Sequence, residues 1–540
     1  MKQMVALVAT LSLATAALAA TAPPKNAPGK SPPESAGAPA SVFAGRTARS
    51  TGTVTVEGHK IAYEAMAGSI VVHPKGWDDA AKPQGKKDEI GTADGPPVAA
   101  MFYVAYFKQG ADPHTRPVTF LYNGGPGSST VWLHMGAFGP VRVVTSNDTH
   151  TPPAPYAAVD NAYSLLDASD LVFIDAPGTG FSRIEGKNKE KAFYGLDQDA
   201  YAFSAFITQF LSQYGRWNSP KYLFGESYGT PRSAVLINDL ETDRDIDFNG
   251  VILLSQILNF DLSADQPESN PGVELPYAVE LPTFAATAWY HHLLGSQPAD
   301  LKSFLQEVEQ FAMGDYSRAL EQGANLPEDQ FDAIAAKLHD YTGLPLAYIR
   351  KANLRISGLQ FEHELQSDSG ETTGRLDTRF SGPAMDPLGE YAEYDPQAAA
   401  IASTYVSVFN EYVRRSLHYA TAETYYPEID TGSWELKHTP PGDSSPSIAS
   451  PNVMPDLANA MKYDPDLKVC LNGGYFDLAT PFYEGIYEMH HLTIPQSLQS
   501  NIEYHYYQSG HMVYANEASL KQLHDNVAAF IRRNASQAGE

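Results

Sequence analysis

The residues best suited to chemistry begin with a serine held between two glycines, in FGESYGT at 224–230. Ser227 follows a run of strand-forming residues and precedes a helical pattern. A tight turn here, permitted by Gly225 and Gly229, projects the hydroxyl out of a sheet. The stretch predicts a nucleophile for carbonyl carbon, and the alternative is a structural turn. Glu226, an acid directly beside this nucleophile, needs an explanation.

A serine nucleophile needs a base, and the base needs an acid that orients it. Asp477 in LNGGYFDLATP and His511 in YHYYQSGHMVY each follow a strand pattern, and both come after Ser227. Either residue alone would be a turn or surface residue, but this order and placement together predict a catalytic triad. Asp175, in FIDAPGTGFS, is a weaker candidate for the acid because it precedes the nucleophile.

A glycine-rich loop, LYNGGPGSS at 121–129, follows another strand pattern. Consecutive glycines let backbone N–H groups face a cavity, as an oxyanion hole requires, and Tyr228 after the nucleophile would supply the other donor. A phosphate-binding loop is the alternative. The stretch lacks the Gly-Lys-Ser/Thr ending of such loops, and no acid follows at the distance that suits a ribose.

The elements that position these residues alternate between strands and helices. Short, continuous apolar runs such as PVTFLYNGG, DLVFIDAPG, KYLFGES, NGVILLSQI and LKVCLNGG are typical of buried parallel strands, and helical patterns at 198–215 and 231–243 separate some of them. Residues 51–72 and 97–107 favour an antiparallel edge. The sequence therefore predicts an α/β fold with a mostly parallel central sheet flanked by helices.

The alternation stops between about 266 and 395, where the patterns become helical, and it resumes after 396. We interpret 266–395 as an inserted helical cap and 46–265 with 396–540 as the catalytic domain.

The N-terminus, MKQMVALVATLSLATAALAA, predicts a signal peptide at 1–19, followed by a flexible leader rich in Pro and Ala at 20–45. Export to a periplasm or out of the cell is expected, and the sequence leaves the choice open.

Composition limits the partners. The net charge of −26 disfavours nucleic acid and anionic membranes, and no basic cluster relieves it. Cys470 is the only cysteine, so an intramolecular disulfide is impossible and a buried thiol is expected. The side chains of the histidine pairs at 291–292 and 490–491 would point apart on a helix, so no metal site is expected there. No cofactor is expected. The oligomeric state is not predicted.

Together, FGESYGT, YNGGPGSS, DAPGTGFS and QSGHMVY resemble the serine carboxypeptidases, a branch of the α/β-hydrolase superfamily, in a disulfide-free form of the bacterial type. The resemblance covers most of residues 95–265 and 395–533. It implies Ser227 as nucleophile, His511 as general base and acid, and Asp477 as orienting acid. It also implies oxyanion N–H groups from Gly125 and Tyr228.

The same resemblance implies that Asn123, the Gly124 backbone and Glu226 hold the C-terminal carboxylate of a peptide. Two carboxyl groups in contact cannot both remain ionised, so they share a proton, and this favours binding at acid pH. Glu226 thereby gains a role as the group that recognises the substrate terminus.

Some positions depart from the family pattern: Leu121 replaces Trp, Ser128 replaces Cys, Ala137 replaces a second Glu, Thr230 replaces Gly, and Tyr514 replaces Pro. Ala137 matters most, because it leaves Glu226 without a partner carboxyl.

The expected function is an exported serine carboxypeptidase that is favoured at acid pH. An esterase or acyltransferase on the same triad is the alternative, and a non-enzymatic binding protein is disfavoured because all three triad residues are present.

Overall fold

One large sheet runs through the molecule in the order β1-β2-β3-β7-β4-β9-β10-β13-β14, with β8 paired to β3. We describe it from a computed structural model, which describes residues 43, 45–77, 91–265, 267–420, 422–432, 434–442 and 450–536, all within the unit Ser41–Glu540. The predicted signal peptide and most of the predicted leader lie outside these residues. The strands are β1 Thr47–Val56, β2 His59–Val72, β3 Val98–Lys108, β4 Val118–Tyr122, β7 Asp170–Ile174, β8 Arg183–Glu185, β9 Lys221–Glu226, β10 Gly250–Leu254, β13 Lys468–Gly474 and β14 Ile502–Tyr507.

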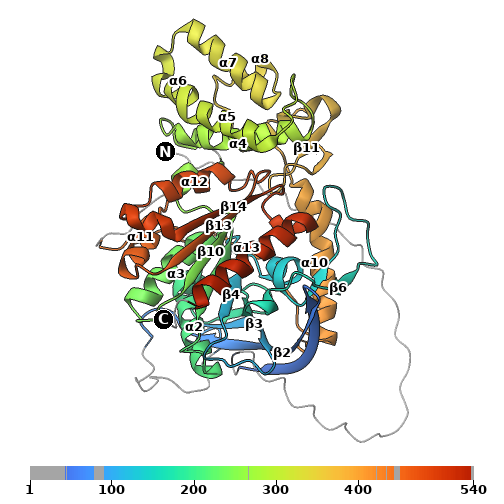
Figure 1. Cartoon of the computed structure of the whole chain (residues 1–540), viewed down its shortest axis with the longest axis vertical. Helices are drawn as coiled ribbons and strands as arrows, with labels where there is room; N and C mark the ends of the chain where they lie inside the picture. The colour runs from blue at the N-terminus through green and yellow to red at the C-terminus, as the bar shows by residue number, and fades with distance from the viewer. Residues whose placement is uncertain are drawn as a thin grey trace, which may run out of the picture. The chain divides into compact units, whose positions relative to one another are not determined.

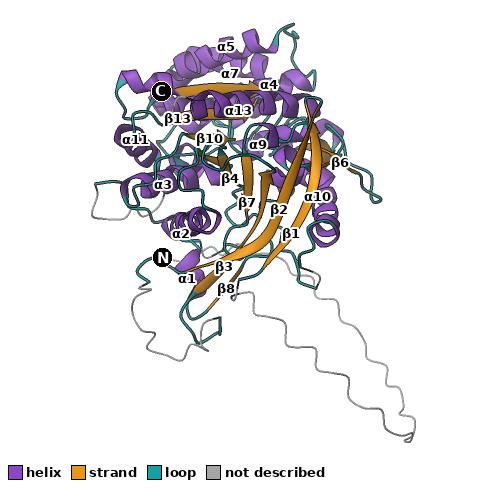
Figure 2. Ribbon diagram, turned by 60° about the horizontal axis from the view of Figure 1, so that its bottom comes forward, coloured by secondary structure: helices purple, strands orange, loops and turns teal. Residues whose placement is uncertain are grey.

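The sheet is parallel from β7 to β14 and antiparallel at the β1 edge. Figure 2 shows β1, β2 and β3 as long orange arrows at that edge. The five residues of β4, β7 and β10 are all buried, which explains why these strands read as continuous apolar runs. The predicted mostly parallel sheet is confirmed.

Helices cover both faces of the sheet (Figure 1). On one face, α2 (Leu196–Tyr214), α3 (Gly229–Thr242) and α11 (Met454–Tyr463) pack on one core cluster. On the other, α10 (Pro396–Arg415) and α13 (Glu517–Ser536) pack on a second cluster. Along β10, Leu253 joins the first cluster and its neighbours Ile252 and Leu254 join the second, as alternating side chains require.

The segment predicted as a cap is helical. It contains α4 (Leu275–Tyr290), α5 (Leu301–Phe311), α6 (Ser317–Gln322), α7 (Glu328–Thr342), α8 (Leu346–Lys351) and α9 (Gly358–Glu364), with a short hairpin of β11 (Glu371–Thr373) and β12 (Ser381–Pro383). These helices share a third core cluster with Phe476, Leu478 and Phe482, which follow β13 near the start of α12 (Phe482–His490). Figure 1 shows α4 to α8 grouped beyond α12. The domain boundaries at 266 and 395 remain a prediction.

The remaining described elements are short. A two-stranded sheet joins β5 (Val141–Val143) and β6 (Ala158–Asp160), and α1 (Lys189–Phe193) precedes α2. Two helical turns, η3 (Leu133–Phe138) and η11 (Val513–Ala515), lie next to the site described below. Cys470 on β13 is fully buried.

Candidate active site

Ser227 occupies a sharp turn between β9 and α3. Its φ of 60° lies in the left-handed region, which is uncommon for a residue with a side chain and marks local strain. Gly225 allows the turn, because a Cβ there would lie 2.2 Å from the Gly229 carbonyl oxygen and 2.5 Å from Ser233 Oγ. The Ser227 N–H donates to the Leu254 carbonyl of β10 at 3.0 Å, which ties the turn to the adjacent strand.

His511 and Asp477 meet although they lie on different loops. Asp477 follows β13, His511 follows β14, and these strands are parallel neighbours. The distance from His511 Nδ1 to Asp477 Oδ2 is 2.8 Å. Asp477 is fully buried, and its Oδ1 accepts the N–H groups of Ala479 and Thr480, both at 3.0 Å. The carboxylate is therefore fixed from the side opposite the histidine.

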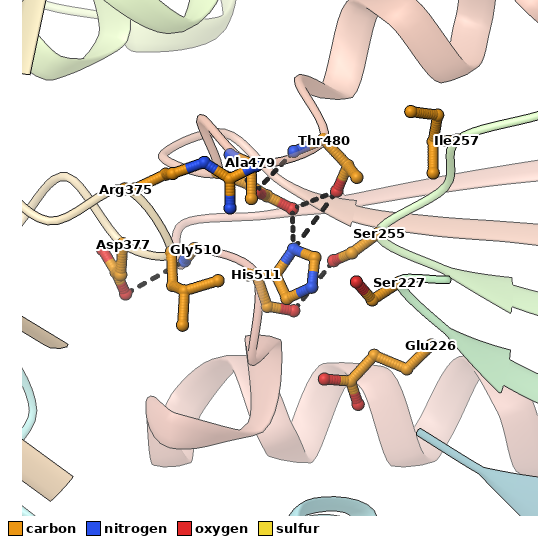
Figure 3. Close-up of polar contacts among 12 residues, drawn as sticks. Glu226, Ser227, Ser255, Ile257, Arg375, Asp377, Ala479, Thr480, Gly510 and His511 are labelled. Atoms are coloured by element: carbon orange, nitrogen blue, oxygen red, sulfur yellow. Dashed lines mark hydrogen bonds and ion pairs between the residues drawn. The ribbon is translucent and has the colours of Figure 1, made fainter. Parts of the chain in front are cut away.

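The contact with Asp477 changes the pKa of His511. Burial lowers its pKa, but the negative charge and hydrogen bond of Asp477 outweigh burial and raise the pKa above 6.5. Figure 3 shows the imidazole of His511 next to Ser227, with the dashed contact to Thr480 on the other side of the ring. Among the described residues, no hydrogen bond joins the Ser227 hydroxyl to His511. Hydrogen bonds of this kind often close only in the substrate complex.

The glycine-rich loop lies directly against the start of α3. A Cβ on Gly124 would lie 2.4 Å from Tyr228 N and 2.6 Å from Gly229 N, so only glycine permits this approach. Asn123 is buried, and its Oδ1 accepts the Leu133 N–H at 3.0 Å. The predicted oxyanion residues Gly125 and Tyr228 thus lie on two adjoining backbone segments.

Glu226 is almost completely buried, with 2 % of its surface exposed. Burial raises its pKa to about 7, against the positive charge of His511 and the hydrogen bonds from Tyr514 and Asn123, which lower it. The Tyr514 hydroxyl donates to both carboxyl oxygens, at 3.1 Å to Oε1 and 2.9 Å to Oε2. A carboxyl with such a pKa carries a proton at acid pH and loses it near neutrality.

One cavity of about 290 Å³ collects most of these groups. Of the eight predicted site residues, its lining includes seven: Asn123, Gly124, Gly125, Glu226, Ser227, Tyr228 and His511. Asp477 lies behind His511. Apolar side chains of Trp132, Ile257, Phe260, Ile401 and Met512 make up much of the remaining wall.

Three residues next to the site were not predicted from the sequence. Thr480 donates its hydroxyl to Asp477 Oδ2 at 2.8 Å and lies 3.2 Å from His511 Nδ1. Arg375 lines the cavity and forms a bidentate ion pair with Asp265. Its Nε donates to Oδ1 at 3.0 Å and its Nη2 donates to Oδ2 at 2.7 Å. Tyr514 was recognised only as a departure from a family pattern. Its position three residues after His511 was the one available signal.

Within the described ranges, no group of three or more His, Cys, Asp and Glu side chains is arranged to hold a metal ion. Nor does any helix in those ranges combine the length and apolar character needed to cross a membrane.

The sheet and the serine, histidine and aspartate at its edge define an α/β hydrolase. The solved structure of KEX1(delta)P, a prohormone-processing carboxypeptidase from Saccharomyces cerevisiae, shares this fold. It has a TM-score of 0.51 and 15 % sequence identity, over 86 % of this chain and 91 % of that one. The chain belongs to the serine carboxypeptidase family, because the model of that family matches residues 92–517.

The proteins similar to this chain are named for more than one activity. Serine carboxypeptidase S10 family member 1 of Dictyostelium discoideum is 32 % identical over 141 residues, 24 % of this chain and 29 % of the relative. The P-(S)-hydroxymandelonitrile lyase of Sorghum bicolor is 27 % identical over 165 residues, 30 % of each chain. These alignments span about a third of each relative's length, so activity requires its own argument.

Proposed function

We propose that this protein is a serine carboxypeptidase that removes C-terminal residues from peptides and works best at acid pH. The observation that supports this most strongly is the buried Glu226 carboxyl, which shares a cavity with Ser227 and has a pKa raised by burial to about 7. A neutral carboxyl donates a hydrogen bond to a substrate carboxylate, whereas an ionised one repels it. Asn123 and the Gly124 backbone complete the proposed carboxylate site.

The proposed reaction begins when Ser227 Oγ attacks the carbonyl carbon of the last peptide bond. His511 takes the hydroxyl proton at Nε2, and Asp477 holds the ring through Nδ1 and stabilises its positive form. The N–H groups of Gly125 and Tyr228 would stabilise the oxyanion of the tetrahedral intermediate.

The C–N bond then breaks, and His511 passes the proton to the departing amine of the C-terminal residue. An acyl-enzyme on Ser227 remains. Water, deprotonated by His511, attacks the acyl carbon. The bond from this carbon to Ser227 Oγ then breaks, His511 returns the proton to Oγ, and the shortened peptide leaves with a new C-terminal carboxylate.

The test is a time course of peptide digestion followed by mass spectrometry. The proposal predicts a ladder of products that lose one residue at a time from a free C-terminus, and none with Ser227→Ala. Internal cleavage, or loss of residues from the N-terminus, would contradict it. The alternative, an esterase or acyltransferase on the same triad, predicts turnover of simple esters without a peptide ladder.

We also propose that the protein is exported, with cleavage of residues 1–19 and a leader at 20–45. The apolar run followed by Ala17-Leu18-Ala19 supports this. N-terminal sequencing of the protein from its native host tests it. A mature N-terminus that begins after residue 19 would support cleavage, and a retained Met1 would contradict it.

A further inference from the structure

We propose that Tyr514 is a positioning residue that takes the place of a second carboxyl group beside Glu226 and so sets the upper pH limit of substrate binding. This inference rests on the proposed carboxypeptidase function. It follows from the contact between the Tyr514 hydroxyl and both oxygens of the Glu226 carboxyl, at 3.1 Å and 2.9 Å.

Tyr514 packs against η3, the turn that holds Ala137, where the family resemblance led us to expect a second acid. Its ring packs on Gly136 in η3, since a Cβ on Gly136 would lie 2.6 Å from Tyr514 Cδ2. The next residue of η3 is the buried Ala137, whose methyl group offers no hydrogen bond. The polar contact to Glu226 therefore comes from a phenol in η11, and Ala137 has no side-chain group that could make one.

Tyr514 acts through Glu226. The catalytic cavity is lined by Glu226, whereas Tyr514 contributes to the wall of a second cavity of about 240 Å³, together with Tyr405 and Arg142. Only 3 % of Tyr514 is exposed. The tyrosine thus contacts the Glu226 carboxyl from the side away from the catalytic cavity.

The chemistry of a phenol differs from that of a carboxyl in this position. Burial and the neighbouring Glu226 charge raise the pKa of Tyr514 well above 10, so its hydroxyl remains a donor. A donor stabilises ionised Glu226 more than neutral Glu226, so it lowers the pH at which the carboxyl loses its proton. A second carboxyl would instead retain a shared proton.

Other groups act on the same carboxyl. The positive charge of His511 and the hydrogen bond from Asn123 lower the pKa of Glu226, and the negative charge of Asp477 raises it. Tyr405, from α10, is close enough for the Glu226 charge to add to burial in raising its own pKa. Tyr405 therefore offers a matched control, a buried phenol in the same surroundings for which no hydrogen bond to Glu226 is found among the described residues.

The experiment measures kcat/KM from about pH 4.5 to about pH 9 for an N-blocked dipeptide and for its C-terminal amide. Wild-type protein is compared with Tyr514→Phe and Tyr405→Phe. The amide does not use the carboxylate contact but does need neutral His511. The ratio of the two kcat/KM values therefore isolates Glu226.

In Tyr514→Phe, we expect the pH at which this ratio declines to rise by about 1 unit, because a hydrogen bond to a charged group is lost. The amide profile and the Tyr405→Phe ratio should match wild type. An unchanged midpoint in Tyr514→Phe, or an equal shift in Tyr405→Phe, overturns the inference. If Tyr514→Phe does not fold, Gly136→Ala tests the same contact by displacing the Tyr514 ring, with the same upward shift expected and an unchanged midpoint counting against it. Because that Cβ would also lie 2.8 Å from Tyr405 Cε1, the unchanged ratio of Tyr405→Phe is needed to assign the shift to Tyr514.

Failure of the proposed function has a different signature. Wild-type protein would then give equal kcat/KM values for the free acid and the amide at every pH. A wild-type preference for the free acid with no effect of Tyr514→Phe would refute the role of Tyr514 alone.

Discussion

His511 Nδ1 lies 2.8 Å from Asp477 Oδ2, and the carboxylate is held on its other side by two backbone N–H groups. This arrangement fixes the imidazole with its Nε2 free to act on Ser227. Asp477→Asn should lower kcat by about 10⁴-fold, because the amide favours the wrong tautomer. Steady-state kinetics checks this, with thermal melting to establish that the variant is folded. A folded variant with nearly normal kcat would exclude Asp477 as the orienting acid.

The approach of Gly225 to Gly229 makes a second prediction. Gly225→Ala places a methyl group against a backbone carbonyl that would lie 2.2 Å away, so the turn at Ser227 must shift. We expect kcat to fall by about 10²-fold or more, since misplacement of about 1 Å has that effect. Gly485→Ala is the control, because its Cβ would make only ordinary contacts, with Leu471 at 3.5 Å and Gln256 at 3.8 Å. Equal activity of the two variants would disprove the steric argument.

Arg232 and Asp199 form an ion pair at 2.5 Å with both side chains fully buried. Arg232 also donates to the Asn123 carbonyl at 2.7 Å, which links the pair to the glycine-rich loop. Arg232→Met leaves the buried Asp199 carboxylate without its ion-pair partner. This should lower the free energy of unfolding by about 3–5 kcal/mol, measured by urea denaturation. Arg350→Met, which breaks a partly exposed pair with Asp332, should cost about 0–1 kcal/mol. Similar losses in both variants would count against the account.

Because several carboxyl groups are buried, we expect the stability of the folded state to fall as pH rises. Burial raises the pKa to about 7 for four groups and to about 9 for a fifth; they are Asp175, Glu226, Glu309, Glu488 and Glu241. The folded state holds these protons where the unfolded state releases them, so their stabilisation is present below the unfolded pKa and is lost as pH rises through the folded one. His134, whose pKa burial lowers to about 3, opposes this only up to 6.5. Tm should therefore be higher at about pH 5 than at about pH 8, and the reverse order would contradict the account.

Glu484 allows a sharper version of this test. Its side chain is fully buried, neither carboxyl oxygen has a hydrogen-bond partner among the described residues, and burial raises its pKa well above 4.5. Glu484→Gln removes the titration, so the difference in Tm between acid and alkaline pH should shrink. Glu393→Gln, at an exposed position, should leave the difference unchanged. No difference between the two variants would show that Glu484 is already ionised.

The sequence predicted the sheet and the position of the site because both depend on local patterns. Continuous apolar runs mark the strands, and residues just beyond the ends of parallel strands meet at one edge. This brought Ser227, Asp477 and His511 together from separate motifs. Their catalytic roles are still predictions.

The other features of the site depend on packing between segments that are distant in the sequence, and no local sequence pattern predicts such packing. Arg375 and Tyr514 reach the site from the predicted cap segment and from η11, respectively. The sequence predicts that Glu226 shares a proton with a substrate carboxylate, whereas in the structure burial is the largest cause of its raised pKa. Burial of one carboxyl can be judged only once the surrounding elements are in place.

Glu226 has the central role in the proposed function, as the group that binds the C-terminal carboxylate of the substrate. The most direct measurement is the ratio of kcat/KM for an N-blocked dipeptide to that for its amide, in wild type and in Glu226→Gln. In wild type, the ratio should be high at acid pH and decline as pH rises through about 7, the pKa of Glu226. In Glu226→Gln, the ratio should be independent of pH. A wild-type ratio of one at every pH, or one that rises steadily with pH, would contradict the account.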